Sequence, residues 1–435
     1  MDIRGLNGGN FTLWARITLN TTASPTNGKD LQKQERWEDD EKSEQNDYII
    51  GENRQNYVQH DGNLKTDAAS FNETIDIAYG EGKTGTSIGF DTVSKITGVN
   101  NKLRPISSFL PKGGNTLPNF FTKGLDLGLR PKDYQKGIIA FLHHNKAAGS
   151  SVKLCLLSMT RRGVIKDHYS SCVVSSKKIS STEIKVFQKY AVFVGGYTFW
   201  LCEQFESRNC SYFTIMRNPY DRILSSYFYC QNQPWDQLCG PLQTGNFTIQ
   251  EWALYQGSYF FNQLLMNRDY CQPNDDLRHL FNRGFSDFIP PNAGHYISYE
   301  SAKQCWFRQK VFLTRNVNET GRMHLLQNVL DNLESWFSVI GMTDEFDLSL
   351  KMLSFTYELP FLRRCRGKII NKGNYAGSGK SEQENMKEML KSALHADSRV
   401  VEALKYDVMI YERGLQIFER QKKRLESLLA KKIQT

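Results

Sequence analysis

The stretch "KGIIAFLHHNKAAGSS", Lys136–Ser151, decides the fold that we expect. It opens with a short apolar run, Ile138–Leu142, which is typical of a strand buried on both faces of a parallel sheet. A lysine and a loop of small residues follow. The next segment, "SVKLCLLSMTRR", is dense enough in apolar side chains for a buried helix. Strand, tight loop and helix in this order predict an α/β fold.

The same pattern recurs further along the chain. We expect strands at Ala191–Val194 and at Tyr212–Met216, and the second of these runs into "RNPYDRILSSYFYC". Pro219 suits an early helical position there, and apolar residues recur on one face of the helix that would follow. Another strand is expected at Phe337–Ile340, with a helix after Gly341. The sequence therefore predicts a central, mainly parallel sheet flanked by helices.

Composition predicts where the folded part lies. Residues 1–132 are polar, with no sustained helical or strand period, and are expected to form a disordered stem or leader. A single domain is expected over residues 133–425, followed by a charged tail at residues 426–435. The chain has 435 residues, which is long enough for an enzyme with a substantial core.

The charge balance indicates the chemistry of the partners. A formal net charge of +9 favours anions such as a nucleotide, an acidic glycan, a nucleic acid or a lipid headgroup. However, the Lys and Arg residues are spread along the chain, and no basic stretch is interleaved with regularly spaced aromatic residues. A nucleic-acid partner is therefore not expected.

Cysteines and glycosylation sequons bear on the compartment. All nine cysteines lie between Cys155 and Cys365, and two pairs, Cys202 with Cys210 and Cys230 with Cys239, are spaced like disulfide-closed loops. None has CxxC spacing, so no zinc site is expected; buried reduced thiols are the alternative. Six N-x-S/T sequons favour the secretory pathway. The sequence contains neither a signal peptide nor a membrane span, so either an N-terminal anchor is absent from it or the protein is cytoplasmic.

The loop after the first strand has the features of an anion site. Small residues at a helix N-terminus expose backbone N–H groups, and a lysine adds a positive charge. The lysine precedes the small residues, unlike in the Walker A pattern, and the alternative is an ordinary turn with a surface lysine. The residues expected to bind the anion are Lys146, Ala147, Ala148, Gly149, Ser150 and Ser151.

A second candidate site follows the strand at Tyr212–Met216. Arg217 falls at the carboxyl end of this strand, where open α/β sheets bind ligands, and Ser225 lies about two helical turns further on. The guanidinium can bind a phosphate through two hydrogen bonds, and the hydroxyl adds a donor. The alternative is an ordinary helix start with a structural arginine.

Together the two stretches resemble the signature of PAPS-dependent Golgi carbohydrate sulfotransferases, the heparan sulfate 2-O- and 6-O-sulfotransferase type. "FLHHNKAAGSS" is similar to the family's 5′-phosphosulfate loop, and "RNPYDRILSSY" is similar to its 3′-phosphate motif. The resemblance implies a P-loop-like sulfotransferase fold and a donor site for PAPS (3′-phosphoadenosine 5′-phosphosulfate) without a metal. In that site Lys146 and the small-residue loop hold the phosphosulfate, and Arg217 and Ser225 hold the 3′-phosphate.

The chain departs from this family at two places. Asn145 stands where the family usually has proline, and Ala147 and Ala148 replace threonine and glycine. The histidine expected upstream of the 3′-phosphate motif as catalytic base is missing, because the chain reads "VGGYTFWLCEQFE" there. The candidates for the base are Glu203, His143, His144 and His295.

We therefore expect an enzyme that transfers a sulfuryl group in line from PAPS to a hydroxyl group of a glycosaminoglycan-like acceptor in the Golgi lumen. Lys146 would meet the charge that develops on the oxygen leaving sulfur. One alternative is a catalytically weak homologue that only binds the glycan or the nucleotide. A further alternative is a P-loop kinase-like nucleotide-binding protein. The sequence does not choose among a glycosaminoglycan, another glycan and a tyrosyl protein as the acceptor, and it predicts neither the position sulfated nor the oligomeric state.

Overall fold

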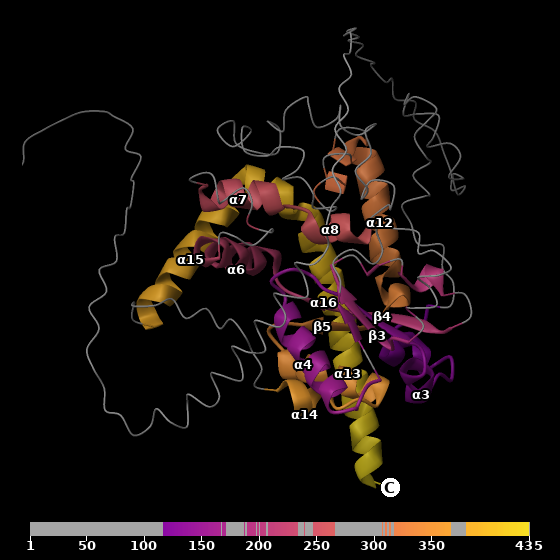
Figure 1. The fold of residues 1–435 in the computed structure, drawn as a ribbon. Coiled ribbons are helices and arrows are strands. Elements are labelled where there is room, and N and C mark those ends of the chain that lie inside the picture. Colours follow the sequence, from indigo (N-terminus) through magenta and orange to yellow (C-terminus); the bar gives the residue numbers. More distant parts are fainter. Residues whose placement is uncertain are drawn as a thin grey trace, which may run out of the picture. The chain divides into compact units, whose positions relative to one another are not determined.

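A parallel β-sheet lies at the centre of the part of the chain that the computed structural model describes (Figure 1). The described residues belong to one unit, Gly85–Thr435. They are 116–166, 168–170, 187, 189–196, 198–199, 201–205, 208–233, 239, 247–265, 307, 309–310, 313–314, 317–366 and 380–434. The predictions that fall on residues 1–115, on His295 and on the sequons at Asn10, Asn20, Asn72 and Asn246 lie outside them.

Five strands pair in the order β2-β3-β1-β4-β5, and all four pairings are parallel. Every residue of β1, β3, β4 and β5 is buried, which explains their continuous apolar sequences. The predicted α/β fold with a parallel sheet is confirmed. The strands are β1 (Ile138–Leu142), β2 (His168–Ser170), β3 (Val192–Gly195), β4 (Cys210–Met216) and β5 (Phe337–Met342).

The strand register determines which ends of the strands, and so which loops, lie at the same edge of the sheet. Ile138 pairs with Cys210 and Leu142 with Thr214, so the carboxyl ends of β1 and β4 lie at the same edge. From β1 the chain continues to β2 and β3 on one side, whereas from β4 on the other side it continues to β5. The carboxyl edge of β1 and β4 is thus a topological switch point, the place where open α/β sheets bind ligands.

Helices flank the sheet. α4 follows β1 directly and α6 follows β4, as the sequence predicts, and α13 packs against β5. The helices are η3 (Phe120–Gly124, a π-helix), α3 (Pro131–Gln135), α4 (Gly149–Arg161), η4 (Leu201–Gln204, a 3₁₀ helix), α6 (Pro219–Asn232), α7 (Ile249–Gln256), α8 (Tyr259–Leu264), α12 (Glu319–Trp336), α13 (Phe346–Tyr357), α14 (Phe361–Cys365), α15 (Lys380–Ala396) and α16 (Ser398–Gln434).

Helix α16 covers the free edge of β5. The Gln421 amide donates to the carbonyl of Ile340 at 2.7 Å and accepts from the Ile340 N–H at 3.1 Å, as a neighbouring strand would. Asn119 donates both to Gln421 and to the carbonyl of Phe337. These contacts satisfy backbone groups that an edge strand would otherwise leave exposed.

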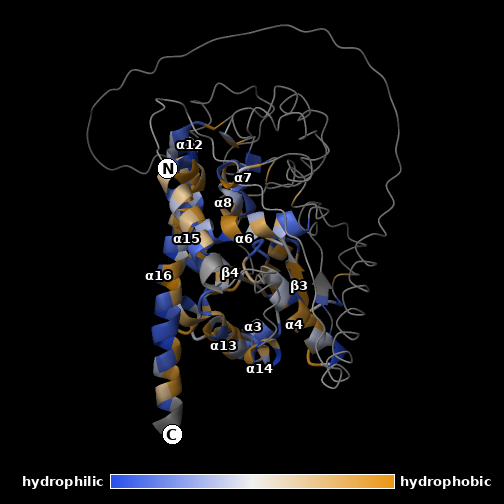
Figure 2. Ribbon diagram, turned by 90° about the vertical axis from the view of Figure 1, so that its left-hand side faces the viewer, coloured by the Kyte–Doolittle hydropathy of each residue, from blue (hydrophilic) through white to orange (hydrophobic). Residues whose placement is uncertain are grey.

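The folded part begins earlier in the chain than composition predicts. Leu117, Phe120 and Phe121 are core residues, although they precede the expected boundary at residue 133. At the other end, hydrophobic and hydrophilic residues alternate along α16, as Figure 2 shows. Leu425 of this helix is buried, and α16 continues without a break into the expected tail as far as Gln434.

Three disulfides join Cys155 with Cys365, Cys202 with Cys210 and Cys230 with Cys239. The last two confirm the pairing that spacing predicts. The first ties α4 to α14 across 210 residues of sequence, a separation that no local pattern reveals. The disulfides indicate an oxidising compartment. In the part of the chain that the structure describes, no helix combines the length and apolar composition needed to cross a membrane.

An acidic residue joins the start of α12 to α16. Glu319 accepts hydrogen bonds from Lys405 at 2.6 Å, Arg322 at 2.7 Å and Tyr406 at 2.9 Å. Burial raises the pKa of this carboxyl, but the three hydrogen bonds outweigh burial and lower the pKa to about 2. Glu319 therefore stabilises the fold through its charged form.

We expect Glu319→Gln to lower the thermal unfolding midpoint at pH 7 by about 1–3 °C, since the site is partly exposed and screened. A lowered pKa means that this stabilisation is present above the unfolded-state value of 4.5 and is lost as the pH falls toward about 2. The difference between wild type and variant should therefore shrink from pH 7 to pH 3. Glu426→Gln, at an exposed position of α16, is the control. Equal midpoints for wild type and Glu319→Gln at pH 7 would contradict the assignment.

Candidate anion-binding site

The loop between β1 and α4 turns sharply on residues that are not glycine. Lys146 has a φ of 64° and Ala148 a φ of 61°, both in the left-handed region. Such conformations cost about 1–3 kcal/mol each and persist where the surrounding structure enforces them. The loop thus delivers the chain into α4 at Gly149 with its first backbone N–H groups at the carboxyl edge of the sheet.

Gly149 is required by a close approach. A Cβ atom built on it would lie 1.7 Å from Nε2 of His143, so the imidazole ring occupies the space that a side chain would need. The first residue of α4 and the first residue after β1 are therefore packed directly against each other. This contact holds the two ends of the β1–α4 loop together.

The residues at the start of α6 cap this helix. The Asn218 side chain accepts hydrogen bonds from the N–H groups of Tyr220 and Asp221, and Pro219 takes the first helical position. These features hold the turn that carries Arg217 immediately after β4.

The two loops meet at Lys146. Nη1 of Arg217 donates a hydrogen bond to the Lys146 carbonyl at 3.2 Å, across 71 residues of sequence. The Lys146 ammonium lies 3.7 Å from the centroid of the Tyr229 ring in α6. Ser225 is one helical turn before Tyr229 and therefore lies on the same face of α6. The two segments that are predicted to bind an anion thus lie side by side.

Positive charge collects around this site. Burial, followed by the charges of Lys153 and Lys146, lowers the pKa of His143 to about 3. The ring is therefore neutral at physiological pH, and the two ammonium groups must lie close enough to act on it. The pKa of Arg222 is lowered as well, first by burial and then by the positive charge of Arg217. An anion would offset this potential.

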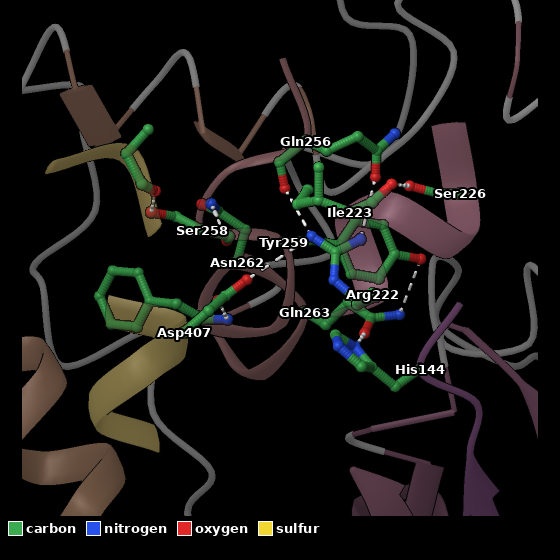
Figure 3. A network of polar contacts seen from close by, with 12 residues as sticks. His144, Arg222, Ile223, Ser226, Gln256, Ser258, Tyr259, Asn262, Gln263 and Asp407 are labelled. Atoms are coloured by element: carbon green, nitrogen blue, oxygen red, sulfur yellow. Dashed lines mark hydrogen bonds and ion pairs between the residues drawn. The ribbon is translucent and has the colours of Figure 1, made fainter. Parts of the chain in front are cut away.

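His144, Arg222, Gln263 and Asp407 belong to a buried polar network, which Figure 3 shows. Gln263 of α8 contacts Nδ1 of His144 at 3.0 Å and donates to the carbonyls of Gly196 at 2.9 Å and His143 at 3.3 Å. It thereby joins the segments that follow β1 and β3. Next to it, Arg222 of α6 donates to Gln256 and lies 3.8 Å from a carboxylate oxygen of Asp407.

The predicted binding residues lie in or beside the loop. Ala147 and Ser151 are buried, Ser150 is exposed, and Ala148 and Ser225 are half-buried. Gly149 and Ser151 belong to the first turn of α4, and Ser225 belongs to α6. The hydroxyl of the adjacent Ser226 is buried and serves the core, because it accepts a hydrogen bond from Trp252 and donates one to Ile223.

Glu203 does not join this group. The adjacent Cys202 is bonded to Cys210, the first residue of β4, and its N–H donates to the Tyr212 hydroxyl. Because β4 ends at Met216, these bonds hold Glu203 at the amino edge of the sheet, opposite Lys146 and Arg217. Seven strand residues span about 20 Å. The structure thus separates the expected base from the expected anion site.

Sequence reasoning missed Lys153, Tyr229 and Gln263. Lys153 lies four residues after Gly149, so helical spacing from the loop is the signal that points to it. Tyr229 stands in the same relation to Ser225. Gln263 has no local signal, because its partner His144 is 119 residues away in the sequence.

No protein-family model matches the chain, and no curated protein matches it in sequence. Among the described residues, no group of three or more His, Cys, Asp or Glu side chains is arranged to hold a metal ion.

Proposed function

We propose that this protein is a sulfotransferase that moves a sulfuryl group from PAPS to a hydroxyl group of a glycosaminoglycan-like glycan. One observation carries the proposal: the hydrogen bond from Arg217 to the Lys146 carbonyl joins the two loops that resemble a 5′-phosphosulfate loop and a 3′-phosphate motif. Neither loop alone distinguishes an anion site from an ordinary turn. Their meeting at a topological switch point favours one nucleotide held by both.

The residues present fit such a donor. The first turn of α4 directs backbone N–H groups at the carboxyl edge of the sheet, Gly149 lets His143 pack against the loop, and Lys146 and Lys153 supply positive charge. Arg217 and the Ser225 hydroxyl would hold the 3′-phosphate. In the transfer, the acceptor oxygen forms a bond to sulfur as the bond from sulfur to the 5′-phosphate oxygen breaks. 3′,5′-ADP leaves, and the hydroxyl proton passes to water or to one of the other candidate bases, His143, His144 or His295. Lys146 would stabilise the charge that appears on that oxygen.

We expect Gly149→Ala to weaken binding of 3′,5′-ADP about tenfold, because an overpacked contact costs about 1–3 kcal/mol and here it displaces His143 from the loop. Calorimetric titration measures the effect. The matched control is Gly163→Ala, after the other end of α4. Gly163 has a φ of +66° but open space around it, so its variant should lose stability without losing affinity. Unchanged affinity in Gly149→Ala would show that the loop tolerates the displacement.

The proposal drops Glu203 as general base, since the Cys202–Cys210 disulfide keeps it at the opposite edge of the sheet. This position favours a second candidate: a homologue that binds the nucleotide or the glycan without turnover. The oxidising compartment indicated by the disulfides agrees with either, and we place the protein in the Golgi lumen.

Transfer of radiolabelled sulfate from PAPS tests the proposal directly. The acceptors are a heparan-type glycosaminoglycan, a chondroitin-type glycosaminoglycan and a neutral glycan, each incubated with the full chain with its disulfides intact. The proposal predicts label in at least one acidic glycan and none in the neutral one. Binding of 3′,5′-ADP without transfer to any acceptor would favour the second candidate.

A further inference from the structure

The side chain of Tyr229 lies against the lysine on which the site depends. The Lys146 ammonium is 3.7 Å from the ring centroid, well inside the roughly 6 Å range of a cation–π contact. Tyr229 lies in the last turns of α6, whereas Lys146 follows β1. A helix that begins at the 3′-phosphate motif therefore also reaches the 5′ loop.

Lys146 is held by three independent constraints. Its backbone has a φ of 64°, its carbonyl accepts the Arg217 hydrogen bond, and its ammonium lies over Tyr229. Fixing a lysine side chain costs rotamer entropy, which these contacts must offset. Backbone strain and side-chain restraint at one residue indicate a position set for a task.

We propose that Tyr229 is a positioning residue that orients the Lys146 ammonium group toward an anion in the β1–α4 loop. An ammonium group has three N–H donors. One side of the group faces the ring, so a bound oxyanion would approach it from the side away from the ring. The inference deepens the proposed function, and its turnover consequences rest on that function; the contact itself does not.

The contact also explains a spacing in α6. Ser225 and Tyr229 are four residues apart and share a face, so one face carries a hydroxyl near the start of the helix and a ring near its end. Along the chain, Arg217 comes first, followed by Ser225 and then Tyr229. Tyr229 would act on a bound anion only through Lys146, whereas Arg217 would contact a phosphate directly.

The first measurement uses the full chain with lysine labelled at the ε-carbon, without any ligand. A lysine held over an aromatic ring has its ε-CH₂ resonance shifted upfield by the ring current, and Lys146→Met identifies the resonance. The upfield shift should remain in Tyr229→Phe and disappear in Tyr229→Leu. The control is Phe228→Leu, which removes the neighbouring aromatic ring of α6 and should leave the shift unchanged. An upfield shift that survives Tyr229→Leu would overturn the proposal whatever the protein's activity.

The second measurement is sulfate transfer by the same variants. Tyr229→Leu should lower kcat about threefold to tenfold, which is the scale of one partly desolvated cation–π contact, while KM for PAPS changes less. Tyr229→Phe should restore wild-type turnover. In a Lys146→Met background, Tyr229→Leu should have no further effect, because its role acts through that lysine.

The two measurements separate the two failures. If the wild type transfers no sulfate, the proposed function fails, and the lysine resonance alone decides whether Tyr229 holds Lys146. If the wild type transfers sulfate and Tyr229→Leu does so at the same rate, the positioning role is overturned. If Tyr229→Leu causes the same loss whether or not Lys146→Met is also present, the effect is structural, and the positioning role is overturned as well.

Discussion

Replacing Lys146 by alanine is expected to lower sulfate turnover by about 100-fold or more while weakening the binding of PAPS much less. The reason lies in when the charge is needed. Bound PAPS carries no full charge on the oxygen between sulfur and phosphorus, and that charge appears as the bond breaks, so the ammonium contributes more to the transition state than to the bound donor. Single-turnover transfer and calorimetry on the same protein measure the two effects.

The chain offers a matched control for this change. Lys189 also lies over an aromatic ring, 4.8 Å from the centroid of Tyr190, but it precedes β3 at the opposite edge of the sheet. Lys189→Ala should leave turnover unchanged. A Lys146→Ala variant with normal turnover would remove Lys146 from the mechanism, and an equal loss of turnover in Lys189→Ala would mean that the effect does not belong to the site.

Arg217→Ala is expected to weaken 3′,5′-ADP binding about 30-fold to 100-fold, since hydrogen bonds to a charged group contribute about 1.5–3 kcal/mol. Binding of 5′-AMP, which lacks the 3′-phosphate, should fall only about threefold. That smaller loss reflects the hydrogen bond from Arg217 to the Lys146 carbonyl, which shapes the loop for either ligand.

The control for Arg217 is Arg208. Arg208 lies just before β4, whereas Arg217 lies just after it. Arg208→Ala removes an arginine from the other end of the same strand and should leave both affinities unchanged. Equal losses for 3′,5′-ADP and 5′-AMP in Arg217→Ala would contradict the assignment of Arg217 to the 3′-phosphate and would leave it a purely structural role.

Elements with a local signature were predictable from the sequence. The continuous apolar run fixed β1 at Ile138–Leu142, and Asn-Pro marked the start of α6 at Pro219. The three-residue β2 had no such signature. The contact between Gln421 and β5 was hidden too, because it joins residues 81 positions apart.

The candidate site divides in the same way. Parallel strands carry their following loops to one edge, so the meeting of Lys146 and Arg217 follows from two correctly predicted strands. The position of Glu203 could also be inferred, because the predicted pairing of Cys202 with Cys210 ties it to the start of β4. The contact between Tyr229 and Lys146 depends on how α6 packs, which helical periodicity alone does not determine.

The most direct test of the donor site is calorimetric titration of the full chain, disulfides intact, with 3′,5′-ADP and with ADP. The two ligands differ in where a phosphate stands, on the 3′ position or at the end of a diphosphate. A PAPS-type site held by Lys146 and Arg217 predicts at least about tenfold tighter binding of 3′,5′-ADP. Failure of the folded chain to bind 3′,5′-ADP, or a preference for ADP, would contradict the proposed sulfotransferase function.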